Sequence, residues 1–161
     1  MPVDVDESHL LIDPAAVERS LTPRTQAIVP VHLFGQTAFV EQLLPLASAA
    51  GIPVIEDAAQ SQGARRNGRS GGSLATVAAT SFYPGKNLGA AGDAGAVTTS
   101  DPEIARMVRL LAAHGSETKY VHEVVGMNSR LDTIQAVVLS AKLARLEKWN
   151  ELRRHAVEQS V

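Results

Sequence analysis

Residues 76–115 of the chain, TVAATSFYPGKNLGAAGDAGAVTTSDPEIARMVRLLAAHG, carry the clearest indication of the fold. Two short apolar runs, 76–83 and 95–100, are typical of strands, and the loop between them is rich in glycine and alanine. A helix is predicted over 101–115, because an Asp-Pro pair fits its N-cap and first turn and apolar residues then recur at helical spacing. A strand, a loop, a second strand and a helix in this order are typical of an α/β domain.

The same alternation of strands and helices extends upstream. Predicted strands cover 2–6, 25–34 and 52–60, and predicted helices cover 13–21 and 39–51. Asp13 and Pro14 fit the start of the first helix, and Gly51 fits the end of the second. Pro45 lies inside the second helix and predicts a kink or a later start. Because the run at 25–34 is almost continuously apolar, as buried parallel strands are, we predict an α/β fold with a mostly parallel sheet and flanking helices.

The end of the chain has a different pattern. Residues 127–161 contain no glycine or proline, and Leu131, Ile134 and Val138 keep helical spacing. This pattern predicts one continuous helix of roughly thirty residues, well above the usual mean of about a dozen. We therefore divide the chain into a domain over 1–127, which the family resemblance described below implies is incomplete, and a long helix over 128–161.

The composition excludes several functional classes. A net charge of −2 with scattered basic residues argues against nucleic-acid binding. The absence of cysteine excludes disulfides, thiol nucleophiles and thiolate metal sites, and the histidines lack metal-ligand spacing, so no metal site is predicted. No apolar run reaches the roughly 18 residues of a membrane span, and the acidic first residues do not form a secretory signal. We expect a cytoplasmic protein without a membrane partner.

Lys86 is the first candidate site residue. It lies between Gly85 and Gly89, directly after an aromatic-containing strand. A lysine in such a loop can simply be solvated. Held among small and aromatic side chains, it can instead lose its charge by desolvation and act as a nucleophilic amine that forms a Schiff base.

Asp57 is the second candidate, because it follows the apolar run PVIE at the end of a predicted strand. It can serve as a metal ligand, a ribose acceptor, the partner of a heterocyclic cation, or only as a helix cap or solvated acid. Glu56 is expected to point to the opposite side. Lys86 and Asp57 together supply the amine and the acid that pyridoxal phosphate chemistry needs, and the Ser81 hydroxyl is a candidate phosphate anchor. His32 is either a hydrogen-bonded core histidine, which we favour, or a pocket residue.

Two glycine-containing stretches are similar to nucleotide-binding motifs. GARRNGRS, residues 63–70, has the spacing of a phosphate-binding P-loop with arginine in place of lysine. The residues AAQSQ (58–62) lie between Asp57 and this stretch, however, and the following SGGSL prevents a helix. GAAGDAG, residues 89–95, lacks the glycine order of a dinucleotide site and does not lead from a strand into a helix. We predict neither a P-loop nor a dinucleotide site.

Four separate segments resemble one protein family. They are PVHLFGQ (30–36), IPVIEDAAQSQGA (52–64), SFYPGKNLGAAGDAGAV (81–97) and GMNSRLDTIQAVVL (126–139). In this order they are similar to the DegT/DnrJ/StrS-type sugar aminotransferases, which have the aspartate aminotransferase fold (fold type I) and use pyridoxal 5′-phosphate. The resemblance covers nearly the whole chain and begins in the middle of the large cofactor-binding domain. It implies that further elements upstream and a small C-terminal domain complete the protein.

The resemblance assigns a role to each candidate residue. Lys86 would form the Schiff base with pyridoxal phosphate and then act as acid and base in the proton shift. Asp57 would pair with the pyridinium nitrogen, Gln60 would contact the phenolic oxygen, and Ser81 would bind the phosphate. Asn128 would reach the cofactor phosphate of the other subunit in a homodimer.

The resemblance also implies a reaction. A lysine rather than the histidine of the sugar dehydratases at this position favours transamination. The expected substrates are a nucleotide-linked keto-deoxy sugar, aminated at C-3, and glutamate as the amino-acid donor. The alternative is a non-catalytic remnant or interaction protein that retains the fold and pairs with a full-length partner through its long helix.

Overall fold

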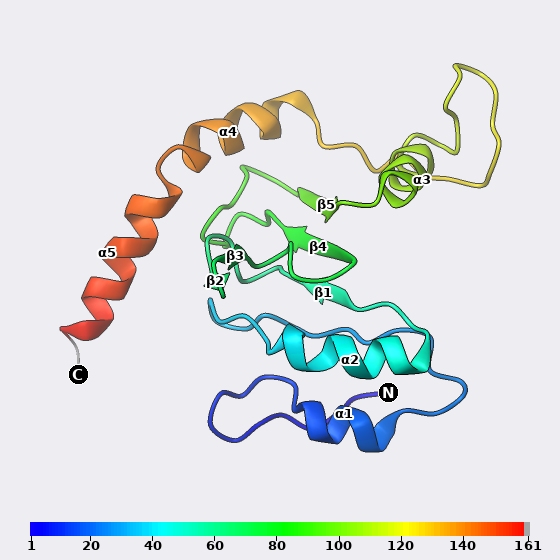
Figure 1. Cartoon of the computed structure of the whole chain (residues 1–161). Coiled ribbons are helices and arrows are strands. Elements are labelled where there is room, and N and C mark those ends of the chain that lie inside the picture. The colour runs from blue at the N-terminus through cyan, green and yellow to red at the C-terminus, as the bar shows by residue number, and fades with distance from the viewer. Residues whose placement is uncertain (160–161) are drawn as a thin grey trace.

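The computed structural model describes residues 1–159. Five helices and five short strands occur in this part of the chain (Figure 1). In chain order they are α1 (Pro14–Ser20), α2 (Val40–Ala50), β1 (Ile55–Asp57), β2 (Arg65–Arg66), β3 (Arg69–Ser70), β4 (Val77–Ser81), β5 (Gly95–Thr99), α3 (Pro102–Ala112), α4 (Thr133–Leu143) and α5 (Leu146–Glu158).

The central sheet has the strand order β1-β4-β5. Strand β1 pairs with β4 in parallel, with Asp57 opposite Ala79, whereas β5 pairs with β4 antiparallel. The segment 25–34 runs parallel to β1 on its other side through two isolated bridges, Ile28 to Val54 and Val31 to Asp57. The α/β fold is therefore confirmed, with a mixed sheet in which β1 and the segment 25–34 run parallel and β5 is antiparallel.

The helix boundaries follow the predicted capping residues. Asp13 accepts hydrogen bonds from the first turn of α1, and Asp101 does the same for α3. Gly51 ends α2 in the left-handed conformation, with φ of 67°. Pro45 lies inside α2, but the helix still begins at Val40, so the later start is not observed.

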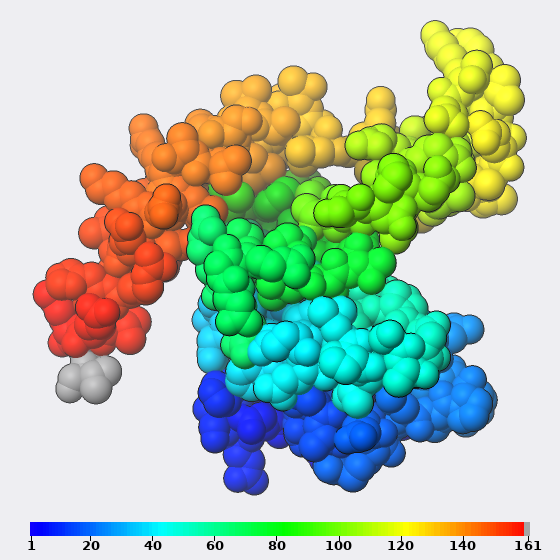
Figure 2. Space-filling model, viewed as in Figure 1, coloured from blue at the N-terminus to red at the C-terminus, as the bar shows by residue number. Residues whose placement is uncertain are grey.

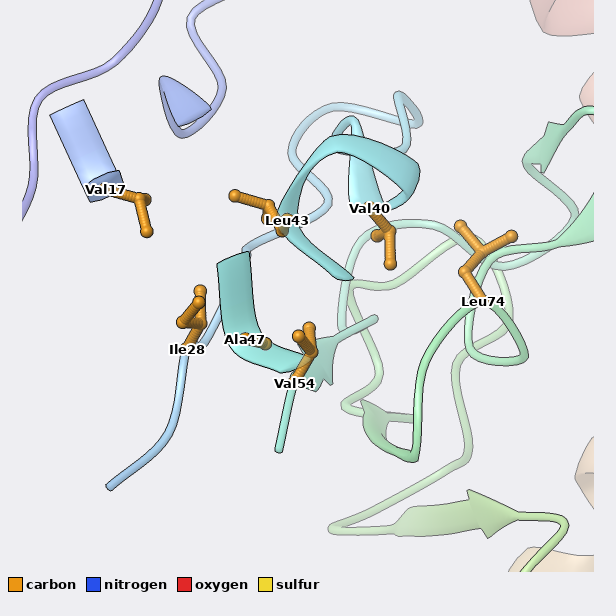
Figure 3. Packing of buried hydrophobic residues seen from close by; sticks show 7 residues of the cluster. All are labelled: Val17, Ile28, Val40, Leu43, Ala47, Val54 and Leu74. Carbon is orange, nitrogen blue, oxygen red and sulfur yellow. The ribbon is translucent and has the colours of Figure 1, made fainter. Parts of the chain in front are cut away.

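The main hydrophobic core lies between the first two helices and the sheet. Its buried members are Val17, Ile28, Val40, Leu43, Ala47, Val54 and Leu74. Figure 3 shows the side chains of α1 and α2 directed towards those of the strand segments. A second, smaller cluster joins the loop after β4 to the two C-terminal helices and contains Leu88, Ala90, Leu139 and Leu146. The first cluster fixes the sheet, and the second attaches α4 and α5 to it.

Two of the predicted strands differ from the structure. Residues 2–6 form only one bridge, between Val5 and Ile12, because the chain turns back at Asp6, whose carboxylate caps the turn. The run at 25–34 is extended but not continuously buried, since Val29 and Val31 are 53% and 41% exposed. Its outward side chains therefore lie on the surface of the described chain.

The single long helix predicted over 127–161 is wrong. Helix α4 ends at Leu143 and α5 begins at Leu146, and between them the Arg145 N–H is bonded to the Lys142 carbonyl three residues earlier. No glycine or proline marks this break in the sequence. It changes the direction of the chain, so that α4 and α5 contact different parts of the body (Figure 1). Tertiary contacts, rather than local propensity, account for it.

A buried carboxylate connects three segments of the domain. Glu56 in β1 is fully buried and its Oε2 accepts a hydrogen bond of 2.8 Å from His32 Nε2. Its two oxygens also accept backbone N–H groups of Gly72, Leu74 and Ala75 at 2.7–2.8 Å. His32 Nδ1 accepts from the Ala38 N–H at 3.0 Å, so the proton of the neutral ring lies on Nε2. The prediction that His32 is a hydrogen-bonded core residue is confirmed.

We expect Glu56→Gln to lower the free energy of unfolding by about 3–5 kcal/mol, because an amide cannot accept four hydrogen bonds at a site closed to water. Urea denaturation followed by circular dichroism measures this loss. Glu41→Gln is the control, since Glu41 forms only a partly exposed ion pair with Arg66 and should cost less than about 1 kcal/mol. Equal losses in both variants would contradict the assigned role of Glu56.

The stability of the chain should also depend on pH through Glu56. Burial raises the pKa of this carboxyl. Hydrogen bonds from His32 and from the Ala75, Gly72 and Leu74 N–H groups lower it by more, so the pKa lies below its usual value. A lowered folded-state pKa stabilises the protein above the unfolded-state pKa, and this contribution is lost as the pH falls through the folded-state pKa. The urea concentrations at which the native chain and Glu56→Gln are half unfolded should therefore become more similar as the pH falls from neutral to acid. A constant difference would oppose this linkage.

Candidate functional site

A cavity of about 760 Å³ lies between α5 and the loops that follow the strands. Figure 2 shows the opening between the C-terminal helix, in red, and the body of the molecule. The residues that line it are Phe34, Gly35, Gln60, Gln62, Gly63, Ala64, Gly85, Lys86, Asn87, Asn150, Arg153, Arg154, Val157 and Glu158. Two of the predicted site residues, Lys86 and Gln60, are thus brought to one cavity from different loops. Its volume is within the range of small-molecule sites.

The loop that carries Lys86 is a tight turn. The Lys86 N–H donates to the Tyr83 carbonyl at 2.9 Å, and the Ala90 N–H donates to the Phe82 carbonyl at 2.7 Å. A side chain at Gly89 would collide with the backbone oxygen of Pro84, so only glycine allows this close approach. Lys86 itself is half-buried at the cavity wall. These backbone contacts therefore fix the loop that carries Lys86 at the cavity wall.

Asp57 and Ser81 lie at the carboxyl ends of neighbouring parallel strands. Asp57 ends β1 opposite Ala79, and Ser81 ends β4 two residues later. The Asp57 carboxylate accepts from the Ala59 N–H at 3.1 Å, and the Ser81 hydroxyl oxygen accepts from the Tyr83 N–H at 3.2 Å. Glu56 is buried on the opposite side of β1, as strand alternation predicts. The edge of a parallel sheet where strands end is the usual position of a ligand in this class of fold.

Gln60 is fixed by the segment 25–34. Its side-chain oxygen accepts from the Phe34 N–H at 3.3 Å, and its backbone oxygen accepts from the Gly35 N–H at 3.0 Å. Asp57 is bridged to Val31 in the same segment. The acid, the amide and the serine therefore share one edge of the sheet, although Asp57 and Ser81 are not among the residues that line the cavity.

Asn128 is separate from this group. It lies in an exposed segment bridged to Ala113 at the end of α3, and its side-chain oxygen accepts from Arg130 Nε at 3.3 Å. It does not line the cavity that contains Lys86. Its predicted action in the site of a second subunit stays a prediction.

Three polar residues around the lysine loop are not among the predicted site residues. Asn87 and Asn150 bind one another at 3.2 Å, and each donates to the backbone oxygen of Gln62. The Gln62 side chain donates to the Thr80 hydroxyl at 2.7 Å and to the Ser81 carbonyl at 2.9 Å. Its own Oε1 is buried and is without a hydrogen-bond partner within residues 1–159. Asn87 could have been suspected from its position next to Lys86, but nothing in the sequence connects it with Asn150.

The P-loop-like stretch at 63–70 forms a β-hairpin. Strands β2 and β3 pair antiparallel, with Asn67 and Gly68 at the turn, where both residues have positive φ. No helix follows it, as the sequence predicted. Over residues 1–159, no cluster of three or more histidine and acidic side chains could hold a metal ion. In the same range none of the helices has the length and apolar character needed to span a bilayer.

Comparison with known proteins identifies clear relatives. A family model described as the DegT/DnrJ/EryC1/StrS aminotransferase family matches residues 1–159. The chain is 52% identical over 153 residues to a dTDP-3-amino-3,4,6-trideoxy-alpha-D-glucose transaminase of Streptomyces venezuelae, an alignment that covers 95% of the chain and 40% of the relative. The chain thus spans less than half the length of this relative.

Solved structures agree with the sequence match. A crystal structure of DesV from S. venezuelae in complex with a ketimine intermediate superposes with a TM-score of 0.93 at 52% identity, over 96% of this chain and 42% of the other. NtdA from Bacillus subtilis with bound cofactor PMP superposes with a TM-score of 0.82 at 32% identity, over 91% of this chain and 33% of the other. The architecture of the 159 described residues is therefore that of these aminotransferases.

We expect Gly89→Ala to disrupt the lysine loop, because its methyl group would collide with the Pro84 carbonyl. The free energy of unfolding should fall by more than about 1 kcal/mol, as for alanine at other backbone positions that only glycine tolerates. Gly85→Ala is the matched control, since its methyl group would meet only the Tyr83 ring at an ordinary 3.4 Å. Thermal unfolding of both variants measures the difference. Similar melting temperatures would show that the close approach at Gly89 is not required.

Proposed function

This chain belongs to the DegT/DnrJ/EryC1/StrS aminotransferase family, and from this premise we propose that it is the lysine-bearing part of a sugar aminotransferase. The observation that carries the proposal is the position of Lys86, which lines one cavity together with Gln60 and lies on the loop that leaves the strand ending at Ser81. Because the chain spans 40% of its transaminase relative, the complete activity is proposed for the protein in which the remaining elements are present.

The residues present fit pyridoxal phosphate, the cofactor of this family. The cavity is large enough for it, an amine and a carboxamide line the cavity, and a carboxylate and a hydroxyl lie at the adjoining strand ends. Lys86 would hold the cofactor covalently, Asp57 would bind its ring nitrogen, Gln60 its phenolic oxygen and Ser81 its phosphate. When bound, the cofactor supplies an electron sink for the carbon from which a proton is removed.

The protein side chains would then perform distinct tasks. Lys86 Nζ takes up and returns the proton that moves during transamination, from a half-buried position at the cavity wall. The Asp57 carboxylate accepts a hydrogen bond and so keeps the proton on the ring nitrogen. Gln60 is fixed by Phe34 and Gly35, so that its amide group can bind an oxygen without rearrangement.

The substrates follow from the relatives and not from the cavity alone. The transaminase of S. venezuelae is named for a 3-amino-trideoxy sugar linked to dTDP. We propose that the substrate here is likewise a nucleotide-linked keto-deoxy sugar, aminated at C-3, with glutamate as the amino donor. The proposed assembly is a cytoplasmic homodimer, in which Asn128 reaches the cofactor phosphate of the partner subunit.

A second candidate function is favoured by the exposed apolar surface that precedes and includes α4. Tyr120, Val125, Met127 and Ile134 are 64–96% exposed within the described chain. A surface of this kind is typical of a region covered by another chain or domain. The chain could then be a non-catalytic interaction protein that retains the fold and pairs with a full-length partner.

The absorbance spectrum with added pyridoxal phosphate distinguishes the two candidates. We expect the native chain to develop a near-visible band that disappears on reduction with borohydride, with the added mass located on the Lys86 peptide. Lys86→Ala should lose at least about 90% of this band, because the reacting amine is absent. Lys148→Ala is the control, since Lys148 is an exposed lysine on α5 that does not line the cavity. A native chain without the band would favour the interaction protein.

A further inference from the structure

The outer side of the lysine loop is covered by the two C-terminal helices. Leu88 of the loop belongs to the same buried cluster as Leu139 of α4 and Leu146 near the start of α5. Lys142 Nζ of α4 donates to the Gly89 carbonyl at 2.6 Å. The loop therefore depends on residues more than fifty positions later in the chain, which lie on both sides of the break between α4 and α5.

Asn150 of α5 contacts Asn87, the residue that follows Lys86 in the sequence. Its Oδ1 accepts from Asn87 Nδ2 at 3.2 Å, and its Nδ2 donates to the Gln62 backbone oxygen at 3.0 Å. Asn87 Nδ2 also donates to that Gln62 oxygen, at 2.7 Å. The three groups form a closed set of hydrogen bonds, and all are partly buried. One side chain of α5 thus fixes the residue that follows Lys86.

Asn150 of α5 also lies so close to Gly63 that only glycine fits there. A side chain at Gly63 would collide with Asn150 Nδ2, and Gly63 also has a φ of 88°. Gln62 extends the network to the sheet, because its Nε2 donates to the Thr80 hydroxyl and the Ser81 carbonyl at the end of β4. Asn150 is therefore bonded, through Gln62, to the strand end that carries Ser81 as well as to the loop that carries Lys86.

We infer that Asn150 is a positioning residue for Lys86, which it directs into the cavity through Asn87 and Gln62. The catalytic importance of the Lys86 position rests on the proposed function. The dependence of the loop on Asn150, however, can be measured without any cofactor. Loss of Asn150 leaves Asn87 with one partner instead of two and removes one of the two donors to the Gln62 oxygen. The loop should then open more often while the main core stays intact.

Hydrogen exchange of the peptide 82–91 in the cofactor-free chain tests this directly. We expect Asn150→Ala to accelerate its exchange about five- to thirtyfold, the factor that corresponds to the loss of one or two hydrogen bonds. The acetylation rate of Lys86, measured relative to that of Lys148 in the same molecule, should rise together with the exchange rate. Glu151→Ala, an exposed neighbour on α5, should leave both rates unchanged. Val17→Ala destabilises the main core, so it separates a local effect from a global loss of stability.

A double substitution tests whether the effect passes through Asn87. Asn87→Ala removes the same contact from the side of the loop, and it replaces Asn150→Ala as the test if that variant does not fold. The two substitutions together should accelerate exchange less than the product of their separate effects, because they share one hydrogen bond. Effects that simply multiply would overturn the inference.

The cofactor provides an independent readout of position. In the chain loaded with pyridoxal phosphate, Asn150→Ala should shift the pH midpoint of the near-visible band, whereas Val17→Ala should not. Equal exchange and labelling rates in Asn150→Ala and Glu151→Ala would overturn the inference, whether or not the cofactor binds. Faster exchange in a chain that forms no band would support the positioning of the loop by Asn150 and would overturn only the proposed function.

Discussion

The buried carboxylate of Glu56 is the interaction on which the rest of the domain depends. Its four hydrogen bonds join β1 to His32 and to the backbone at 72–75, so they align the segment 25–34 with the sheet. A charge without access to water is tolerated only when its oxygens are fully satisfied, and here they are. Because Asp57 follows directly and points to the other side of β1, the same interaction places a second carboxylate at the sheet edge.

The candidate site is built on this edge but is completed from the other end of the chain. The loops after β1 and β4 bring Gln60 and Lys86 to the cavity, and α5 forms its opposite wall. The break between α4 and α5 matters for this reason, since it lets one helix contact Leu88 and Gly89 while the next contacts Gln62 and Asn87. The position of the lysine is thus shared between a local turn and long-range contacts.

The chain also has an exposed apolar surface before and within α4. Val125 and Ile134 are 96% and 73% exposed in the described chain, next to the segment that contains Asn128. This surface and the cavity lie in different parts of the molecule, so an interaction role and a catalytic role do not compete for the same residues.

The sequence by itself determined the α/β class, the capped helices, the loop around Lys86 and the family, because each depends on residues close together in the chain. Periodicity also placed Glu56 and Asp57 on opposite faces of one strand. Only the tertiary structure decided the break at Arg145, the four bonds of Glu56 and the link from Asn150 to Asn87. The link from Asn150 to Asn87 joins residues 63 positions apart, and no local pattern encodes such a pairing.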